Sequence, residues 1–285
     1  MSRLSESLKA IRTIENGDQS QISAELENFA KNITNKIDQI SDGLIYGEKD
    51  VDNVIQTGLL NELIGQTKRT PTHQLSTVRI LPLFQICQKG TVEQTQRIYK
   101  SGILHALTPK LKNNNKNVQL FILLTFIYII KNGWKQLKQS AQQSNLQEIL
   151  KYQHPYVADL HKHGIIKRII IEMLTNQNID SQNKRLTCKF LDILYIEGLQ
   201  LPSKLQDQVI SGFNTLNSQD EMQQEGSFGA LSYMSVNKEN YDAIIEEGYL
   251  DDAIDIIREN DKKESRVSRD QLIAHISQKH LHQQQ

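Results

Sequence analysis

The chain has 285 residues, 38% hydrophobic and 23% charged, and its 33 lysines and arginines balance its 33 aspartates and glutamates. This is the composition of an ordinary soluble chain, and five prolines with no alternating apolar pattern predict an all-α fold. The most apolar stretch, residues 118–131, is shorter than the roughly 20 residues that a membrane span needs. The first residues, MSRLSESLKAIRTIENG, lack the apolar core of a signal peptide, so we expect a cytoplasmic location.

Residues 1–47 are predicted to form amphipathic helices ahead of the main array. Leu4, Leu8 and Ile11 share one side of the first helix. Residues 20–41 carry a stronger stripe, spaced by three or four residues: Ile22, Leu26, Phe29, Ile33, Ile37 and Ile40. Such a stripe covers the end of a stacked array or pairs with a partner helix in a coiled coil. We favour the cap, because the end of a stacked array must be covered.

The stretch from Thr91 to Gly133 reads as three helices of one repeat. The first is short and ends at Ser101-Gly102. The second begins at Ile103 and carries three leucines on one face: Leu104, Leu107 and Leu111. The third, residues 118–131, is apolar on nearly every side. A helix of that kind has neighbours on every side, so we expect it at the centre of a stacked array.

The same pattern recurs at four glycines: Gly58, Gly102, Gly164 and Gly248. An apolar stripe precedes each glycine, and a second apolar stretch follows it. Glycine suits the sharp corner between two helices because it accepts a positive φ without a steric cost. A third helix follows three of the four glycines, at residues 74–88, 118–131 and 183–197. The glycine spacings fit a repeat of about 42 residues.

This unit of short helix, glycine, helix and helix resembles the armadillo repeat over residues 48–258. The resemblance implies a right-handed α-solenoid of about five repeats. HEAT-like helix pairs, or an irregular α-superhelix, are the alternatives. A degenerate fourth repeat is expected near residues 201–218, with its third helix at 221–234. Residues 134–153 are an insertion, either a flexible loop or one or two extra helical turns, and residues 259–285 are a polar tail.

No motif in the sequence indicates catalysis, a cofactor or a metal. A phosphate-binding glycine loop, Gly-x-Ser-x-Gly and His-Glu-x-x-His are all absent. His154, His161 and His163 are expected to be surface histidines, because their spacing does not match helical metal ligands. Cys87 and Cys188 are expected to be buried, reduced thiols. We therefore predict that the protein is not an enzyme and holds no cofactor.

The neutral net charge hides blocks of opposite sign. Residues 89–189 hold 16 lysines and arginines against 5 aspartates and glutamates, whereas residues 190–261 hold 3 against 15. These blocks are either solvated surface or docking surfaces for partners of opposite charge. An acidic protein or peptide is expected at the basic middle and a basic surface at residues 190–261. Nucleic acid is not expected, because aromatic residues for base stacking are few and the acidic block repels phosphates.

The resemblance also implies protein binding along a concave surface lined by third helices. In nuclear-import adaptors of that family, tryptophan and asparagine arrays hold a basic peptide. Here Trp134 is the only tryptophan, just beyond a third helix, so import of basic cargo is not expected. The third helices are predicted to present four cations to acidic ligands: Lys131, Lys184, Arg185 and Lys189.

Two functional hypotheses follow. One is a non-enzymatic scaffold, a structural or adaptor subunit of a larger assembly such as a cytoskeletal or ciliary one. The alternative is a soluble regulatory adaptor, such as an armadillo-type chaperone co-factor, with a transient client. The lifetime of the complex separates the two.

Overall fold

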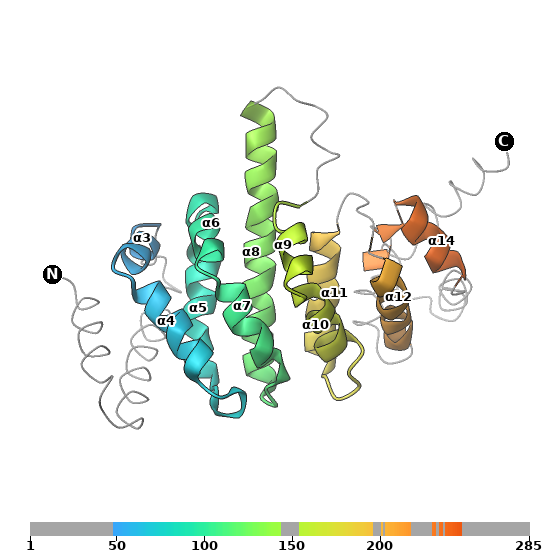
Figure 1. Ribbon diagram of the computed structural model, residues 1–285, viewed down its shortest axis with the longest axis horizontal. Helices are drawn as coiled ribbons and strands as arrows, with labels where there is room; N and C mark the ends of the chain where they lie inside the picture. Colours follow the sequence, from blue (N-terminus) through green and yellow to red (C-terminus); the bar gives the residue numbers. More distant parts are fainter. Residues whose placement is uncertain are drawn as a thin grey trace, which may run out of the picture. The chain divides into compact units, whose positions relative to one another are not determined.

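The computed structural model describes residues 48–143, 154–195, 203–217 and 237–246, together with residues 201, 230, 231, 234 and 235. Every regular element in these residues is a helix, which confirms the all-α prediction for the described part of the chain (Figure 1). The chain divides into two compact units, Met1–Gln136 (the first unit) and Leu137–Gln285 (the second unit). The helices predicted in residues 1–47 and the polar tail lie outside the described residues.

The first unit contains two repeats of the predicted kind. The first repeat consists of α3 (Glu48–Gln56), α4 (Leu59–Arg69), the short 3₁₀ turn η2 (Thr72–Gln74) and α5 (Thr77–Lys89). The second consists of α6 (Val92–Lys100), α7 (Ile103–Leu107), the 3₁₀ turn η3 (Thr108–Lys112) and α8 (Lys116–Gln143). Helix α3 packs against α6, and α4 packs against α7. Equivalent helices of successive repeats therefore stack, so that neighbouring repeats share one core.

The second unit begins with a repeat of the same order. It consists of α9 (Val157–Lys162), α10 (Ile165–Ile169), the π-helical turn η5 (Ile170–Leu174) and α11 (Ser181–Leu194). Two further helices follow, α12 (Ser203–Asn217) and α14 (Lys238–Glu246). Helix α12 packs against η5 and against α14. It occupies the place predicted for the degenerate fourth repeat, whose third helix falls mostly outside the described residues.

Three of the four corner glycines lie in the described residues, and each has the predicted positive φ. The φ angles are 77° at Gly58, 80° at Gly102 and 65° at Gly164. Gly102 ends one helix and begins the next: its N–H donates to the carbonyl of Tyr99 at 3.0 Å, and its carbonyl accepts from Ala106 at 3.1 Å. The corner therefore depends on left-handed backbone that an ordinary L-residue adopts only with strain.

Gly102→Val is expected to destabilise the protein by about 1–3 kcal/mol, the usual cost of holding a non-glycine residue in an unfavourable backbone region. The cost is conformational, since no atom lies within 4 Å of the position that a Cβ would take. Gly102→Asn is the matched control, because asparagine tolerates left-handed backbone better than valine. Urea unfolding of both variants measures the difference, and equal stabilities would contradict this account of the corner.

Helix α8 is twice as long as predicted, with 28 residues in place of the 14 expected at 118–131. The first ten residues of the predicted insertion, 134–143, continue the helix, and residues 144–153 lie outside the described part. The sequence WKQLKQSAQQ contains no proline or glycine and is rich in good helix formers. The second helix of this repeat is shorter than predicted, because α7 ends at Leu107 and the chain continues as the 3₁₀ turn η3. The three leucines predicted to share one face are nevertheless all buried: Leu104, Leu107 and Leu111.

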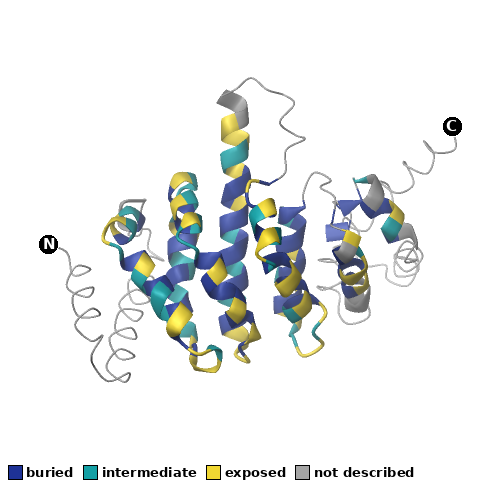
Figure 2. Cartoon of the chain, viewed as in Figure 1, coloured by how far each residue is buried: buried dark blue, intermediate teal, exposed yellow. Residues whose placement is uncertain are grey.

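Polar side chains, in addition to the apolar core, join the two repeats of the first unit. Figure 2 shows the buried residues of these helices in dark blue. Lys110 is 6% exposed, and its Nζ donates to the backbone carbonyls of Lys68 and Thr70. Asn113 Nδ2 donates to the carbonyls of Thr72 and Leu75, the second at 3.0 Å. The second repeat thus donates hydrogen bonds to backbone carbonyls at the end of α4 and in the turn that leads to α5.

Candidate partner-binding faces on the third helices

Only three of the four predicted cations lie on the surface. Lys131 on α8 is exposed, as are Arg185 and Lys189 on α11. Lys184 is 2% exposed, so the prediction that it faces a ligand is wrong. It shares its side of α11 with Cys188, four residues later and fully buried.

Lys189 has a structural partner. Its Nζ lies 2.6 Å from Oδ2 of Asp192, whose side chain is only 8% exposed. Burial raises the pKa of Asp192, the hydrogen bond and charge of Lys189 lower it, and burial is the larger effect. The other carboxylate oxygen, Oδ1, has no hydrogen-bond partner. Lys189 therefore compensates a buried charge, which leaves Lys131 and Arg185 as the two predicted cations without an ion pair among the described residues.

Helix α8 presents a continuous stripe that combines apolar and cationic side chains. Its less buried residues recur every three or four positions, which places them on one side of the helix. Phe121, Leu124 and Tyr128 are half-buried, and Lys131 and Lys135, one and two turns further on, are exposed. Leu124 is therefore not at the centre of the core, contrary to the expectation that this helix is enclosed on every side.

The third helix of the preceding repeat contributes to the same surface. Phe84 of α5 is half-buried, with its ring centroid 5.2 Å from that of Phe121 and 5.9 Å from that of Tyr128. Gln88, one turn later, donates from Nε2 to the Tyr128 hydroxyl at 3.4 Å. We call this surface of the first unit the aromatic–lysine face, and it consists of Phe84, Phe121, Leu124, Tyr128, Lys131 and Lys135.

The tryptophan and asparagine of α8 are used in packing. Trp134 is 8% exposed and lies inside α8, and not just beyond the helix as predicted. The Asn132 amide donates to Thr95 Oγ1 at 2.9 Å and lies 3.5 Å from the carbonyl of Gly90. Both side chains are therefore engaged within the repeat.

The three clustered histidines have three different environments. His154 is 2% exposed, so its prediction as a surface residue is wrong, and its Nδ1 accepts from the N–H of Tyr156 at 3.1 Å. His161 Nε2 lies 2.9 Å from the hydroxyl of buried Tyr195, and burial lowers the pKa of His161. Only His163 is exposed.

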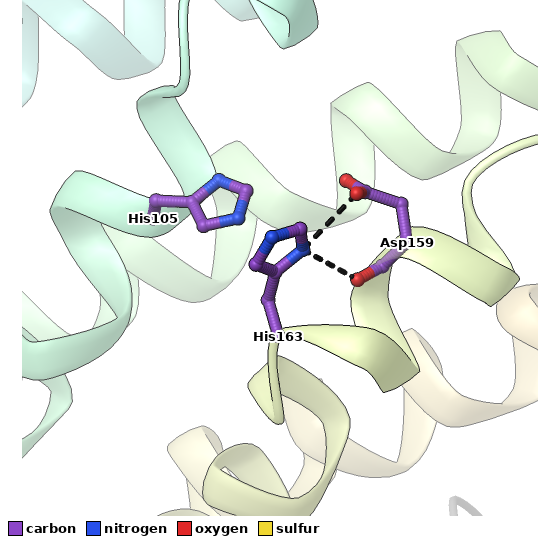
Figure 3. Close-up of side chains that lie close together, drawn as sticks. All are labelled: His105, Asp159 and His163. Atoms are coloured by element: carbon purple, nitrogen blue, oxygen red, sulfur yellow. Dashed lines mark hydrogen bonds and ion pairs between the residues drawn. The ribbon is translucent and has the colours of Figure 1, made fainter.

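His163 pairs with a residue of its own helix turn. Its Nδ1 lies 3.0 Å from Asp159 Oδ1 and 2.9 Å from the Asp159 carbonyl (Figure 3). Asp159 and His163 both belong to the second unit, whereas His105, also drawn, belongs to α7 of the first.

Both cysteines are fully buried free thiols, as predicted. Burial raises the pKa of each far above its ordinary value, and at Cys188 the nearby Lys184 opposes that shift only in part. A thiol of this kind does not form the thiolate that nucleophilic chemistry needs. Within the described residues, no helix has both the length and the apolar character for crossing a membrane.

Comparison with known proteins identifies the fold. No family model and no curated protein matches the sequence. Solved structures do match: a computationally designed armadillo repeat protein for modular peptide recognition has 14% identity and a TM-score of 0.68, over 96% of this chain and 99% of that one. A designed armadillo repeat protein in complex with the peptide (KR)4 has 14% identity and a TM-score of 0.65, over 96% of this chain and 100% of the other. The predicted resemblance is confirmed at the level of structure: this chain has the armadillo repeat fold.

Proposed function

We propose that this protein is a non-enzymatic scaffold that binds other proteins, a structural or adaptor subunit of a larger assembly. The assembly is cytoplasmic, with a cytoskeletal or ciliary one as the first candidate. The alternative is a soluble regulatory adaptor, such as an armadillo-type chaperone co-factor. Both share the same basic activity, which is recognition of a protein surface by side chains on the third helices.

The exposed cations of the third helices carry this proposal. Residues 51–136 of the first unit hold 11 lysines and arginines against 3 aspartates and glutamates, a formal charge of +8. Two of those three acids are already paired, Asp52 with Arg97 at 3.4 Å and Glu62 with Arg69 at 3.0 Å. An uncompensated positive surface attracts acidic partners and speeds their association. The acidic region, residues 190–261, has the opposite preference.

The comparison with designed armadillo proteins supports peptide recognition but not the same ligand. One of those proteins is in complex with (KR)4, a basic peptide. The exposed third-helix charges Lys131 and Arg185 would repel such a peptide. We therefore propose that this chain uses the fold with the opposite charge preference, for acidic partners at residues 89–189.

Partner capture with paired variants tests the proposal. The full chain serves as bait in an extract of its own source cells, and bound proteins are quantified by mass spectrometry at about 0.05 M and about 0.5 M salt, where screening differs severalfold. Lys131→Glu combined with Arg185→Glu is expected to lower recovery of the specific partner at least fivefold at low salt. Lys68→Glu combined with Lys100→Glu makes the same charge change at exposed sites on α4 and α6 and is expected to have little effect.

The salt resistance of the native complex separates the scaffold hypothesis from the regulatory-adaptor hypothesis. A subunit of a stable assembly is expected to remain in a salt-resistant complex during size-exclusion chromatography, whereas a regulatory adaptor leaves most of the chain free. Equal recovery with both variant pairs, each with a native thermal melt, would remove the charge-based proposal.

A further inference from the structure

We propose that the aromatic–lysine face binds an acidic peptide segment that packs one large apolar side chain onto the exposed edges of Phe84, Phe121 and Tyr128 and sets its carboxylates against Lys131 and Lys135. This inference deepens the proposed function and rests on it. It assigns a site and a ligand class: a short segment in which an aromatic or large aliphatic residue is followed by acidic residues.

The aromatic half of the face is unlike the rest of the core. The other aromatic residues of α8, Phe126 and Trp134, are 0% and 8% exposed, whereas Phe121 and Tyr128 both remain half-buried. They meet half-buried Phe84 from α5, and Leu124 lies between them on α8. Partly exposed aromatic rings from two adjacent helices provide apolar area that an inserted side chain removes from water.

The ring geometry favours an inserted side chain over a stacked nucleic-acid base. The rings of Phe84 and Phe121 are tilted by 47°, and those of Phe84 and Tyr128 meet at 61°. A base needs an open, flat ring face on which to stack. Here the Phe84 ring is engaged by both neighbours, and the Tyr128 hydroxyl is held by Gln88. The cluster is thus an angled apolar surface, suited to a side chain such as phenylalanine or leucine.

The cationic half follows directly along the same side of α8. Lys131 and Lys135 lie three and seven residues after Tyr128, about 5 Å and about 10 Å further along the helix axis. Both are exposed, and no acidic side chain of the described residues pairs with either. Helix α5 also ends with an exposed cation, Lys89, two residues after buried Cys87.

The order of these groups determines the ligand. An apolar anchor on the aromatic cluster places neighbouring residues of an extended segment at about 3.3 Å intervals, so carboxylates two to four residues away reach the lysines. A basic segment would bring like charges together on the same face. The face therefore favours an acidic segment in two ways. The aromatic cluster buries the apolar anchor, and the lysines attract the carboxylates.

Fluorescence anisotropy with the full chain tests the inference. The probe is a labelled dodecapeptide with one phenylalanine followed by four glutamates. Controls replace the phenylalanine by alanine, replace the glutamates by lysines, or use a single-stranded oligonucleotide of similar length. We expect the Kd of the probe to be at least about tenfold lower than the Kd of each control.

Variants of the face locate the binding. Tyr128→Ala is expected to weaken probe binding at least fivefold, whereas Tyr128→Phe, which keeps the ring, changes it little. Lys131→Glu with Lys135→Glu is expected to abolish the preference for glutamates over lysines, and Lys100→Glu, the same charge change on exposed α6, to leave it intact. Circular dichroism confirms that each variant is folded.

Several outcomes overturn the inference: no binding of the probe, tighter binding of the lysine peptide or the oligonucleotide, or binding that none of these variants changes. The peptide assay can be told apart from partner capture, because it also uses Tyr128 and Lys135 and does not use Arg185. Charge-dependent capture of a protein partner together with a failed peptide assay would leave the proposed function in place and remove this site.

Discussion

Leu123→Asp is expected to unfold the first unit, whereas Leu124→Asp, one position along the same helix, is expected to leave it folded. Leu123 is 0% exposed on α8, while Leu124 is half-buried on the stripe that faces solvent. Removing the buried leucine and leaving a carboxylate without a partner costs about 5 kcal/mol in all. That is comparable to the whole stability of a typical domain.

Thermal and urea unfolding followed by far-ultraviolet circular dichroism measure the effect. Because each repeat of this fold is stabilised by its neighbours, loss of α8 is expected to remove the helical signal of adjacent repeats as well. A Leu123→Asp protein with a native melt would show that this helix is not a core element. A Leu124→Asp protein that unfolds as readily would show that the aromatic–lysine face is buried.

Lys189→Glu is expected to destabilise the second unit by about 2–3 kcal/mol. It replaces the ion-pair partner of Asp192 with a second carboxylate, next to a side chain that is only 8% exposed and whose Oδ1 already has no partner. Removing one member of a fully buried pair costs about 3–5 kcal/mol, and the cost is lower here because the Lys189 side chain is 58% exposed.

Arg185→Glu provides the matched control. It makes the same charge change four residues earlier on α11, at an exposed residue without an ion pair among the described residues. It is expected to alter the stability by less than about 0.5 kcal/mol. Lys189→Glu combined with Asp192→Asn is expected to recover much of the loss, because the buried charge is gone. If Lys189→Glu and Arg185→Glu have equal stabilities in urea, the Lys189–Asp192 pair contributes nothing measurable.

Charge reversal tests binding only at residues that do not also stabilise the fold. If Lys189→Glu lost binding, the loss of a partner contact could not be separated from the loss of stability. Reversal of Lys184 has the same defect, because a buried position would receive a carboxylate. Lys131 and Arg185 are the positions at which a reversed charge reports on recognition.

The sequence by itself determined the repeat architecture of this protein. The corner glycines were recognisable because a helix end with positive φ restricts the residue type to glycine, and the structure has that φ at Gly58, Gly102 and Gly164. The burial of Leu104, Leu107 and Leu111 followed from helical spacing, and the separation of the basic and acidic regions followed from counting charges. These properties depend on one residue and its near neighbours along the chain.

The proposed binding face depends on the tertiary structure alone. A helix that is apolar on nearly every side has no sequence signal for the side its neighbours leave uncovered, so Leu124 and Leu123 looked alike. Phe84 and Tyr128 lie 44 positions apart, and only the stacking of α5 beside α8 brings their rings to 5.9 Å. Likewise, the exposed pattern of α11 depends on what packs against it. Lys184 and Arg185 are adjacent in sequence, yet contacts from other segments bury the first and leave the second in solvent.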